Sequence, residues 1–127
     1  MIRGHVNDRL EIRVQLTVHG PNGQVRIDAI VDTGFDESPI LPATTIRQLG
    51  LPWLRSDSLF LADGDSAVFD VYDAAVICNR RRRRISVHES DADPLIGTEL
   101  LEGYALNAEF EPGGLAIIRS LKRRRTR

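Results

Sequence analysis

Residues 29–35 constrain this chain more than any other stretch, because an apolar segment runs directly into the triplet Asp32-Thr33-Gly34. The glycine lets the backbone bend after the strand, and a carboxylate at the end of a buried strand is held rigidly enough to exchange protons with a bound molecule. The same triplet is also ordinary turn chemistry. The rest of the chain therefore has to decide between a turn and a catalytic carboxylate.

The size and composition of the chain indicate a single soluble globular domain. It has 127 residues, of which 42% are hydrophobic and 28% are charged, and this is enough to bury a core. No apolar run reaches the roughly 18 residues of a membrane-spanning helix, and residues 1–5 do not resemble a secretory signal. The single cysteine, Cys78, permits no intramolecular disulfide, so we expect a cytoplasmic protein in which this thiol is an inert part of the core.

We expect no bound metal and no cofactor. The three histidines, His5, His19 and His88, stand at no metal-ligand spacing and are predicted to lie at the surface or in turns. The acids at positions 89, 91 and 93 lack the calcium-loop pattern. We expect these acids to pair with Arg80 to Arg84 instead.

Basic residues are concentrated in two runs. The arginine run, Arg80 to Arg84, is predicted to cover a turn, and the second run forms a polybasic tail at residues 122–127. Because like charges repel and stay solvated, we expect this tail to be disordered and residues 1–121 to form the domain. Clustered arginine binds phosphate, but neither run contains aromatic residues for base stacking, so nucleic-acid binding is the less favoured alternative.

The apolar pattern predicts a protein built mainly of strands. Alternation at residues 10–18 and 25–31 predicts a hairpin that turns at Asn22-Gly23 and carries its second strand to Asp32. Short helices are expected after Pro42, ending at Gly50, and after Thr98. Further extended segments are expected at 53–61, 67–77, 85–88, 104–110 and 115–118, with short apolar pieces at 39–41 and 94–97 and with Trp53 in the core. Many short strands with glycine and proline turns predict an all-β barrel or sandwich.

This order of features resembles the retropepsin-like aspartic proteases, the single-domain relatives of retroviral protease. The resemblance extends over residues 10–120 and rests on three motifs: Ile30-Val31-Asp32-Thr33-Gly34 at a strand end, a hairpin around Leu61-Ala62-Asp63-Gly64 where the family has its flap, and Leu95-Ile96-Gly97 before a helix. It implies a small closed β-barrel with one or two short helices. It also implies an aspartic endopeptidase, a hydrolase that acts on peptides or proteins.

The resemblance assigns a role to each matching residue. Asp32 is expected to be the catalytic carboxylate, Thr33 to form a hydrogen bond across a dimer axis, and Gly34 to lie near the substrate backbone. Substrate contacts are expected from Phe35, Asp36 and Glu37 after the triplet and from Ala62, Asp63 and Gly64 in the flap. Ile96 and Gly97 are expected to support the catalytic loop from beneath.

Hydrolysis of a peptide bond explains why a second carboxylate is needed. One group has to accept a proton from water while another donates a proton to the carbonyl oxygen. Two carboxyl groups roughly 3 Å apart share one proton and perform both tasks. Because the chain contains one Asp-Thr-Gly triplet, we expect the second group to be Asp32 of another copy in a symmetric homodimer.

Two departures from the family pattern leave another function open. Phe35 stands where the family commonly has a small residue, and Glu99 stands where an aspartate or asparagine often occurs. A bulky ring beside the triplet would crowd a substrate groove. The alternative is therefore a catalytically silent, dimeric binding or assembly module with the same fold.

Overall fold

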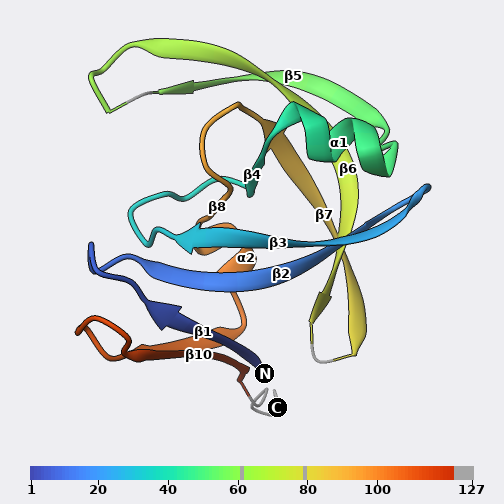
Figure 1. The fold of residues 1–127 in the computed structure, drawn as a ribbon. Helices are drawn as coiled ribbons and strands as arrows, with labels where there is room; N and C mark the ends of the chain where they lie inside the picture. The colour runs from blue at the N-terminus through green and yellow to red at the C-terminus, as the bar shows by residue number, and fades with distance from the viewer. Residues whose placement is uncertain (61, 79, 122–127) are drawn as a thin grey trace, which may run out of the picture.

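The computed structural model describes residues 1–60, 62–78 and 80–121, and in this part of the chain it contains ten strands and two short helices (Figure 1). The predicted disorder of the tail at 122–127 lies outside the described residues and stays a prediction. In chain order the elements are β1 (Ile2–Val6), β2 (Ile12–Gly20), β3 (Gly23–Val31), β4 (Ile40–Leu41), α1 (Ala43–Leu49), β5 (Trp53–Phe60), β6 (Ser66–Cys78), β7 (Arg81–Glu89), β8 (Leu95–Ile96), α2 (Thr98–Leu101), β9 (Tyr104–Ala108) and β10 (Leu115–Ser120).

Six of the strands close into a barrel. They follow the order β6-β7-β4-β8-β3-β2, and β2 closes the ring by pairing antiparallel with β6, where Val18 lies opposite Val76. On one side β5 continues beyond β6, and on the other β1, β10 and β9 continue beyond β2. The predicted all-β fold with a small closed barrel and two short helices is confirmed.

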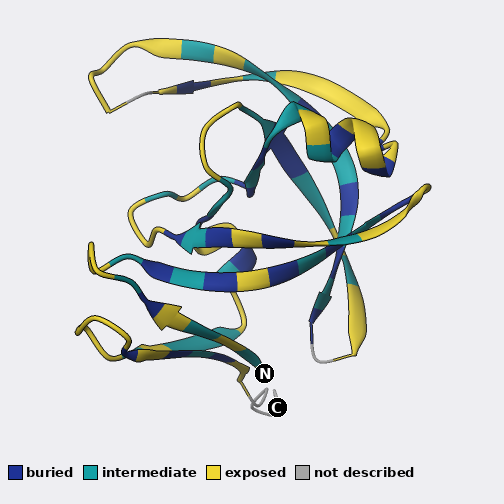
Figure 2. Ribbon diagram, viewed as in Figure 1, coloured by how far each residue is buried: buried dark blue, intermediate teal, exposed yellow. Residues whose placement is uncertain are grey.

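The hairpin of β2 and β3 is the predicted one and carries much of the core. Its turn lies between Gly20 and Gly23, which are register partners. The alternating apolar residues of β2 point into the barrel and are buried, as Figure 2 shows for both strands. Because alternate residues of the strand are buried, its sequence shows the period-2 apolar pattern from which the strand was predicted. The predicted helix α1 also forms, and Gly50 ends it in the left-handed conformation with φ 63°.

The first strand, β1, was not predicted from the sequence. It lies between β2 and β10, with Gly4 opposite Val14 on one side and Ala116 on the other. Its sequence is short and contains a glycine in the middle, so it carries little period-2 signal of its own. Long-range pairing with two neighbours therefore determines this strand.

The arginine run is not a turn, contrary to the prediction. Only Arg80 lies outside a strand, whereas β7 begins at Arg81 and pairs along β6. The expected pairing of this run with the acids at positions 89, 91 and 93 is also wrong for Arg84 and for Asp93, which have other partners. Arg84 donates to both carboxylate oxygens of Asp73 at 2.9 and 3.0 Å, and Asp93 lies 3.8 Å from Arg13. Cross-strand neighbours thus replace sequence neighbours as partners.

Two further predictions about burial are wrong. Trp53 is 59% exposed at the start of β5, and its indole N–H donates to Oδ1 of Asp70 at 3.1 Å across the hairpin. His88 is only 2% exposed, because the end of β7 is covered by segments that the sequence does not reveal as neighbours. His5 is exposed and Cys78 is buried, as predicted. Within the described residues no helix has the length and apolar character needed to cross a membrane.

Candidate active site

Asp32 follows directly on β3 and is fixed by the neighbouring strand β8. The two strands are parallel, with Ile30 opposite Leu95 and Val31 opposite Ile96. The backbone N–H of Asp32 donates to the carbonyl oxygen of Ile96 at 2.9 Å, and that of Ile30 donates to Pro94 at 2.9 Å. The position of Asp32 is therefore set by a buried strand pair rather than by its own loop.

The triplet itself forms a tight turn around the carboxylate. The backbone N–H of Gly34 donates to Oδ1 of Asp32 at 2.9 Å, and that of Phe35 donates to the Asp32 carbonyl at 3.2 Å. Asp32, Thr33 and Gly34 are all exposed. The turn thus orients the carboxylate while leaving it accessible to water and to a ligand.

Gly97 lies directly beneath this turn, and no larger residue fits there. A Cβ atom on Gly97 would lie 2.2 Å from the carbonyl oxygen of Phe35 and 2.7 Å from Cδ2 of its ring. The same carbonyl accepts a hydrogen bond from the backbone N–H of Thr98 at 2.8 Å. Phe35 is half-buried, and the close approach shows that its ring lies over Gly97.

A groove of about 790 Å³ opens beside Asp32 and Thr33. Its walls come from the turn before β2, from the ends of β3 and β8, and from β9 with the residues after it. We call it the catalytic groove after its candidate role, and the residues that line it are Leu10, Glu11, Ile12, Ile30, Val31, Asp32, Thr33, Leu95, Leu106, Asn107, Ala108 and Phe110. Most of them are apolar, so the groove offers hydrophobic contacts next to an exposed carboxylate.

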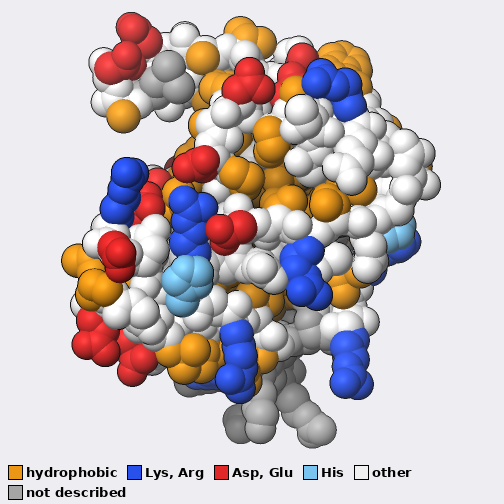
Figure 3. Space-filling view, viewed as in Figure 1, with side chains coloured by type: hydrophobic (Ala, Val, Ile, Leu, Met, Phe, Trp, Pro, Cys, Tyr) orange, Lys and Arg blue, Asp and Glu red, His pale blue; other side chains and the backbone are white. Residues whose placement is uncertain are grey.

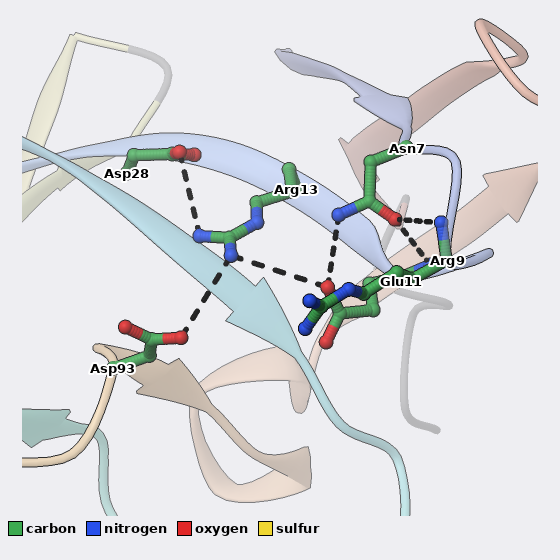
Figure 4. Close-up of polar contacts among 6 residues, drawn as sticks. All are labelled: Asn7, Arg9, Glu11, Arg13, Asp28 and Asp93. Carbon is green, nitrogen blue, oxygen red and sulfur yellow. Dashed lines mark hydrogen bonds and ion pairs between the residues drawn. The ribbon is translucent and has the colours of Figure 1, made fainter.

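The wall at Leu10 and Glu11 is held in place by a polar network (Figure 4). Oδ1 of Asn7 accepts hydrogen bonds from the backbone N–H groups of Arg9 at 3.1 Å and Glu11 at 2.9 Å, and its amide donates to the Glu11 carboxylate at 2.9 Å. These bonds stabilise a turn in which Leu10 has φ 60°, a conformation that costs energy for a residue with a side chain.

The hairpin of β5 and β6 projects over the end of β3 (Figure 1). In the space-filling view it extends beyond the body of the molecule, with a hollow beneath it (Figure 3). Ala62, Asp63 and Gly64 lie exposed at its tip, where Oδ1 of Asp63 accepts from the backbone N–H of Asp65 at 3.0 Å. We call β5, β6 and this tip the flap hairpin.

Two solved structures share this architecture. The retropepsin-like aspartic protease from Rickettsia conorii matches with a TM-score of 0.58 and 18% identity, over 96% of this chain and 91% of that chain. EIAV protease in complex with the inhibitor HBY-793 matches with a TM-score of 0.55 and 14% identity, over 71% of this chain and 84% of that chain. No protein-family profile and no curated protein sequence matches the chain.

This chain has the retropepsin-like fold. Within this fold the residues singled out from the sequence lie at three places. Asp32 and Thr33 line the catalytic groove, while Gly34 completes the turn. Phe35 lies over Gly97, and the buried Ile96 holds Asp32 from below.

The remaining predicted contacts are not among the residues that line the groove. Asp36 is exposed and Glu37 is half-buried after the triplet, and the flap residues Ala62, Asp63 and Gly64 lie at the far tip of the flap hairpin. Sequence reasoning missed the groove walls at Leu10, Leu106 and Phe110. The local sequence offers little signal for them, because an apolar residue in or beside a turn, such as Leu10 or Phe110, does not identify its distant neighbours.

Proposed function

We propose that this protein is a homodimeric aspartic endopeptidase in which Asp32 of each subunit supplies one half of a catalytic dyad. The observation that carries the proposal is the setting of Asp32. It is exposed at the end of a buried strand pair, it lines an apolar groove, and a projecting hairpin lies above it in a retropepsin-like fold. This combination suits a rigidly held acid/base group with bound substrate nearby.

The two carboxyl groups would divide the work of hydrolysis. The ionised group accepts a proton from water as the water oxygen adds to the carbonyl carbon, and the protonated group donates its proton to the carbonyl oxygen. In the second step the C–N bond breaks, the carboxyl group that took the proton from water gives it to the leaving nitrogen, and the other carboxylate takes back the hydroxyl proton as the carbonyl re-forms, which returns the dyad to its starting state. The bond from the Gly34 N–H to Oδ1 would hold one carboxylate edge still during both steps.

The edge of β9 supports a specific way of building the dimer. The backbone N–H of Glu109 donates to the carbonyl of Leu115 at 3.0 Å, and that of Leu121 donates to the carbonyl of Gly103 at 2.9 Å. These two bonds show which residues of β9 point their backbone groups toward β10. Alternation then directs the backbone N–H groups of Leu106 and Ala108 away from β10, toward the open edge of the sheet. Both residues also line the catalytic groove. Pairing of β9 with β9 of a second copy would therefore bring two catalytic loops together.

The groove favours substrates with apolar side chains. Ile30, Leu95 and Phe110 present hydrocarbon surface close to Asp32. Burial of a substrate side chain against such surface contributes about 25 cal/mol per Å² of apolar area. An extended peptide would lie between these walls and the flap hairpin, with its scissile carbonyl at Asp32.

Two alternatives are less well supported. Phe35 packs over Gly97, which weighs against the obstruction on which the silent binding module depends. Three arginines of the arginine run are bonded within the chain: Arg82 to His19, Arg83 to the carbonyl of Leu100 and Arg84 to Asp73. These contacts favour a structural role for this part of the run over phosphate binding.

Cleavage of a peptide library at mildly acidic and neutral pH tests the proposal. The wild type is expected to cleave next to apolar residues, and Asp32→Asn is expected to lose cleavage while keeping its fold. Asp28→Asn is the matched control, because Asp28 is an exposed acid on the same strand and is expected to leave cleavage intact. Equal cleavage by the wild type and Asp32→Asn would contradict the proposed mechanism.

A further inference from the structure

The open edge of β9 limits the ways in which two copies of the chain pair. Within the described residues, β9 lies at one end of the sheet order, so no strand covers this edge. The ladder with β10 directs the even-numbered residues of β9 outward, and by alternation Phe110 faces outward as well. In an antiparallel ladder between two identical edges, outward residues pair with outward residues, so the two-fold axis passes through one residue. An axis at Asn107 uses the whole edge from Tyr104 to Phe110.

The exposure of Phe110 favours the axis at Asn107. Its side chain is 64% exposed beside the open edge, and apolar surface next to an unpaired strand is typical of an interface. With this axis, Phe110 lies opposite Tyr104 of the second copy and diagonal to its Leu106, on the face of β9 that packs against the core. An axis at Leu106 would instead place Phe110 opposite Glu102, an exposed acid that precedes β9.

Charges on the other face of β9 favour the same axis. Glu109 and Arg119 are both exposed there. With the axis at Asn107, Glu109 lies opposite Ala105 of the second copy, and the next residue in that row is Arg119 of the same copy. Because adjacent strands are about 4.8 Å apart, the two backbones are about 10 Å apart, and the two long side chains can meet over the small alanine. An axis moved by one residue in either direction shifts the two charges apart by two residues along the strand.

We infer that two copies pair through β9 in one register, with the two-fold axis at Asn107. Leu106 of each copy exchanges both of its backbone hydrogen bonds with Ala108 of the other. The apolar and the charged contacts then form twice, once on each side of the axis. Because Leu106, Ala108 and Phe110 also line the catalytic groove, the second copy borders the groove of the first. The inference rests on the dimer of the proposed function and adds its register.

A cysteine at position 107 tests this register without any substrate. The two copies of residue 107 form a non-hydrogen-bonded pair, whose Cα atoms are about 4.5 Å apart and within reach of a disulfide. Ala105→Cys is the matched control, because its two copies are about 14 Å apart in this register. After oxidation with oxidised glutathione, Asn107→Cys is expected to give at least about tenfold more disulfide-linked dimer than Ala105→Cys on a non-reducing gel. The wild type, whose single cysteine Cys78 is buried, is expected to give none.

A charge reversal provides a second measurement. Arg119→Glu replaces an attraction by a repulsion on both sides of the axis and is expected to raise the Kd of the dimer about tenfold. Arg3→Glu makes the same change at an exposed arginine on β1, which lies two strands away from the open edge, and is expected to change the Kd less than about twofold. Sedimentation over a range of concentrations measures both values.

The outcomes separate the register from the proposed chemistry. Failure of Asn107→Cys to cross-link, or equal cross-linking of Ala105→Cys, would overturn the inference, as would a wild type that sediments as a monomer at every concentration. If Asn107→Cys does not fold, the charge reversals decide, and equal Kd values for Arg119→Glu and Arg3→Glu would overturn it. A cross-linked dimer that cleaves no peptide would refute only the proposed hydrolysis. Cleavage that needs two copies of Asp32 but comes without the cross-link would refute only the register.

Discussion

The backbone N–H of Asp32 donates to the carbonyl oxygen of Ile96 at 2.9 Å, which joins the loop that carries Asp32 to a strand distant in sequence. The bond continues the parallel pairing of β3 and β8 by one residue. A carboxylate held in this way keeps its place when the exposed residues around it move. The proposed role of Asp32 in proton transfer depends on this rigidity.

Gly97→Ala is expected to destabilise the protein by about 3 kcal/mol, because the new methyl group would collide with the carbonyl and ring of Phe35. Gly34→Ala is the comparison. There the nearest atom to a Cβ is Oδ1 of Asp32 at 3.2 Å, the end of a side chain that can move, so the free energy of unfolding should change far less. Chemical denaturation of both variants measures the difference, and equal losses would contradict the packing described here.

Asn7→Ala is expected to loosen the wall of the catalytic groove. The change removes the acceptor for the backbone N–H groups of Arg9 and Glu11 and should cost about 1–2 kcal/mol. Because the turn carries Leu10, KM for peptide substrates should rise more than kcat falls. Asp8→Ala, at the exposed neighbouring residue, is the control and should leave KM unchanged.

Ala108→Pro is expected to weaken the dimer without breaking the pairing of β9 with β10. Proline removes a backbone N–H that points to the open edge of the sheet, and edge strands tolerate it for this reason. Ala108→Val keeps the N–H and is the matched control. Sedimentation of the two variants at the same concentrations gives the answer, and a fully dimeric Ala108→Pro would exclude the β9 edge as the interface.

Stability is expected to fall on acidification because of His88. Burial lowers its pKa from the ordinary value of 6.5, so the unfolded chain binds a proton at this site more readily than the folded chain. The stability contributed by neutral His88 is present above that value and is lost as pH falls through it toward the folded pKa, by at most about 1.4 kcal/mol per pH unit.

Denaturation of the wild type and His88→Gln between about pH 8 and pH 5 isolates this effect, because other titrating groups act on both proteins. The difference in free energy of unfolding between the two should shift in favour of the variant as pH falls. Asp57→Asn should lose more stability in acid than the wild type, since it lacks the carboxylate that compensates the imidazolium. A constant difference between wild type and His88→Gln would contradict the prediction.

Local signals made the centre of the site predictable. The alternating residues of β3 lead to Asp32 within one strand, and α1 with Gly50 is encoded within a few residues. The groove walls depend instead on long-range pairing, because Phe110 comes near the groove through the pairing of β9 with β10 and of β10 with β1. Neither of the two segments in such a contact has a sequence pattern that identifies the other.

The burial of His88 and the exposure of Trp53 also could not be predicted from their local sequences. His88 lies next to the last residue of β7, and its burial comes from the flap hairpin and from Ser38, which are remote in sequence. Trp53 belongs to an apolar stretch, yet β5 lies at the end of the sheet order and leaves its ring exposed. Burial in this fold is decided by where a strand lies in the sheet as much as by its residues.

Mixing wild-type chains with an excess of Asp32→Asn chains, after exchange of subunits, tests most directly whether two copies of Asp32 form one active site. The variant would sequester wild-type chains in dimers that contain a single catalytic carboxylate. If each active site needs two copies of Asp32, a tenfold excess of the variant is expected to lower wild-type peptidase activity about tenfold. Activity that stays constant per wild-type chain would contradict it.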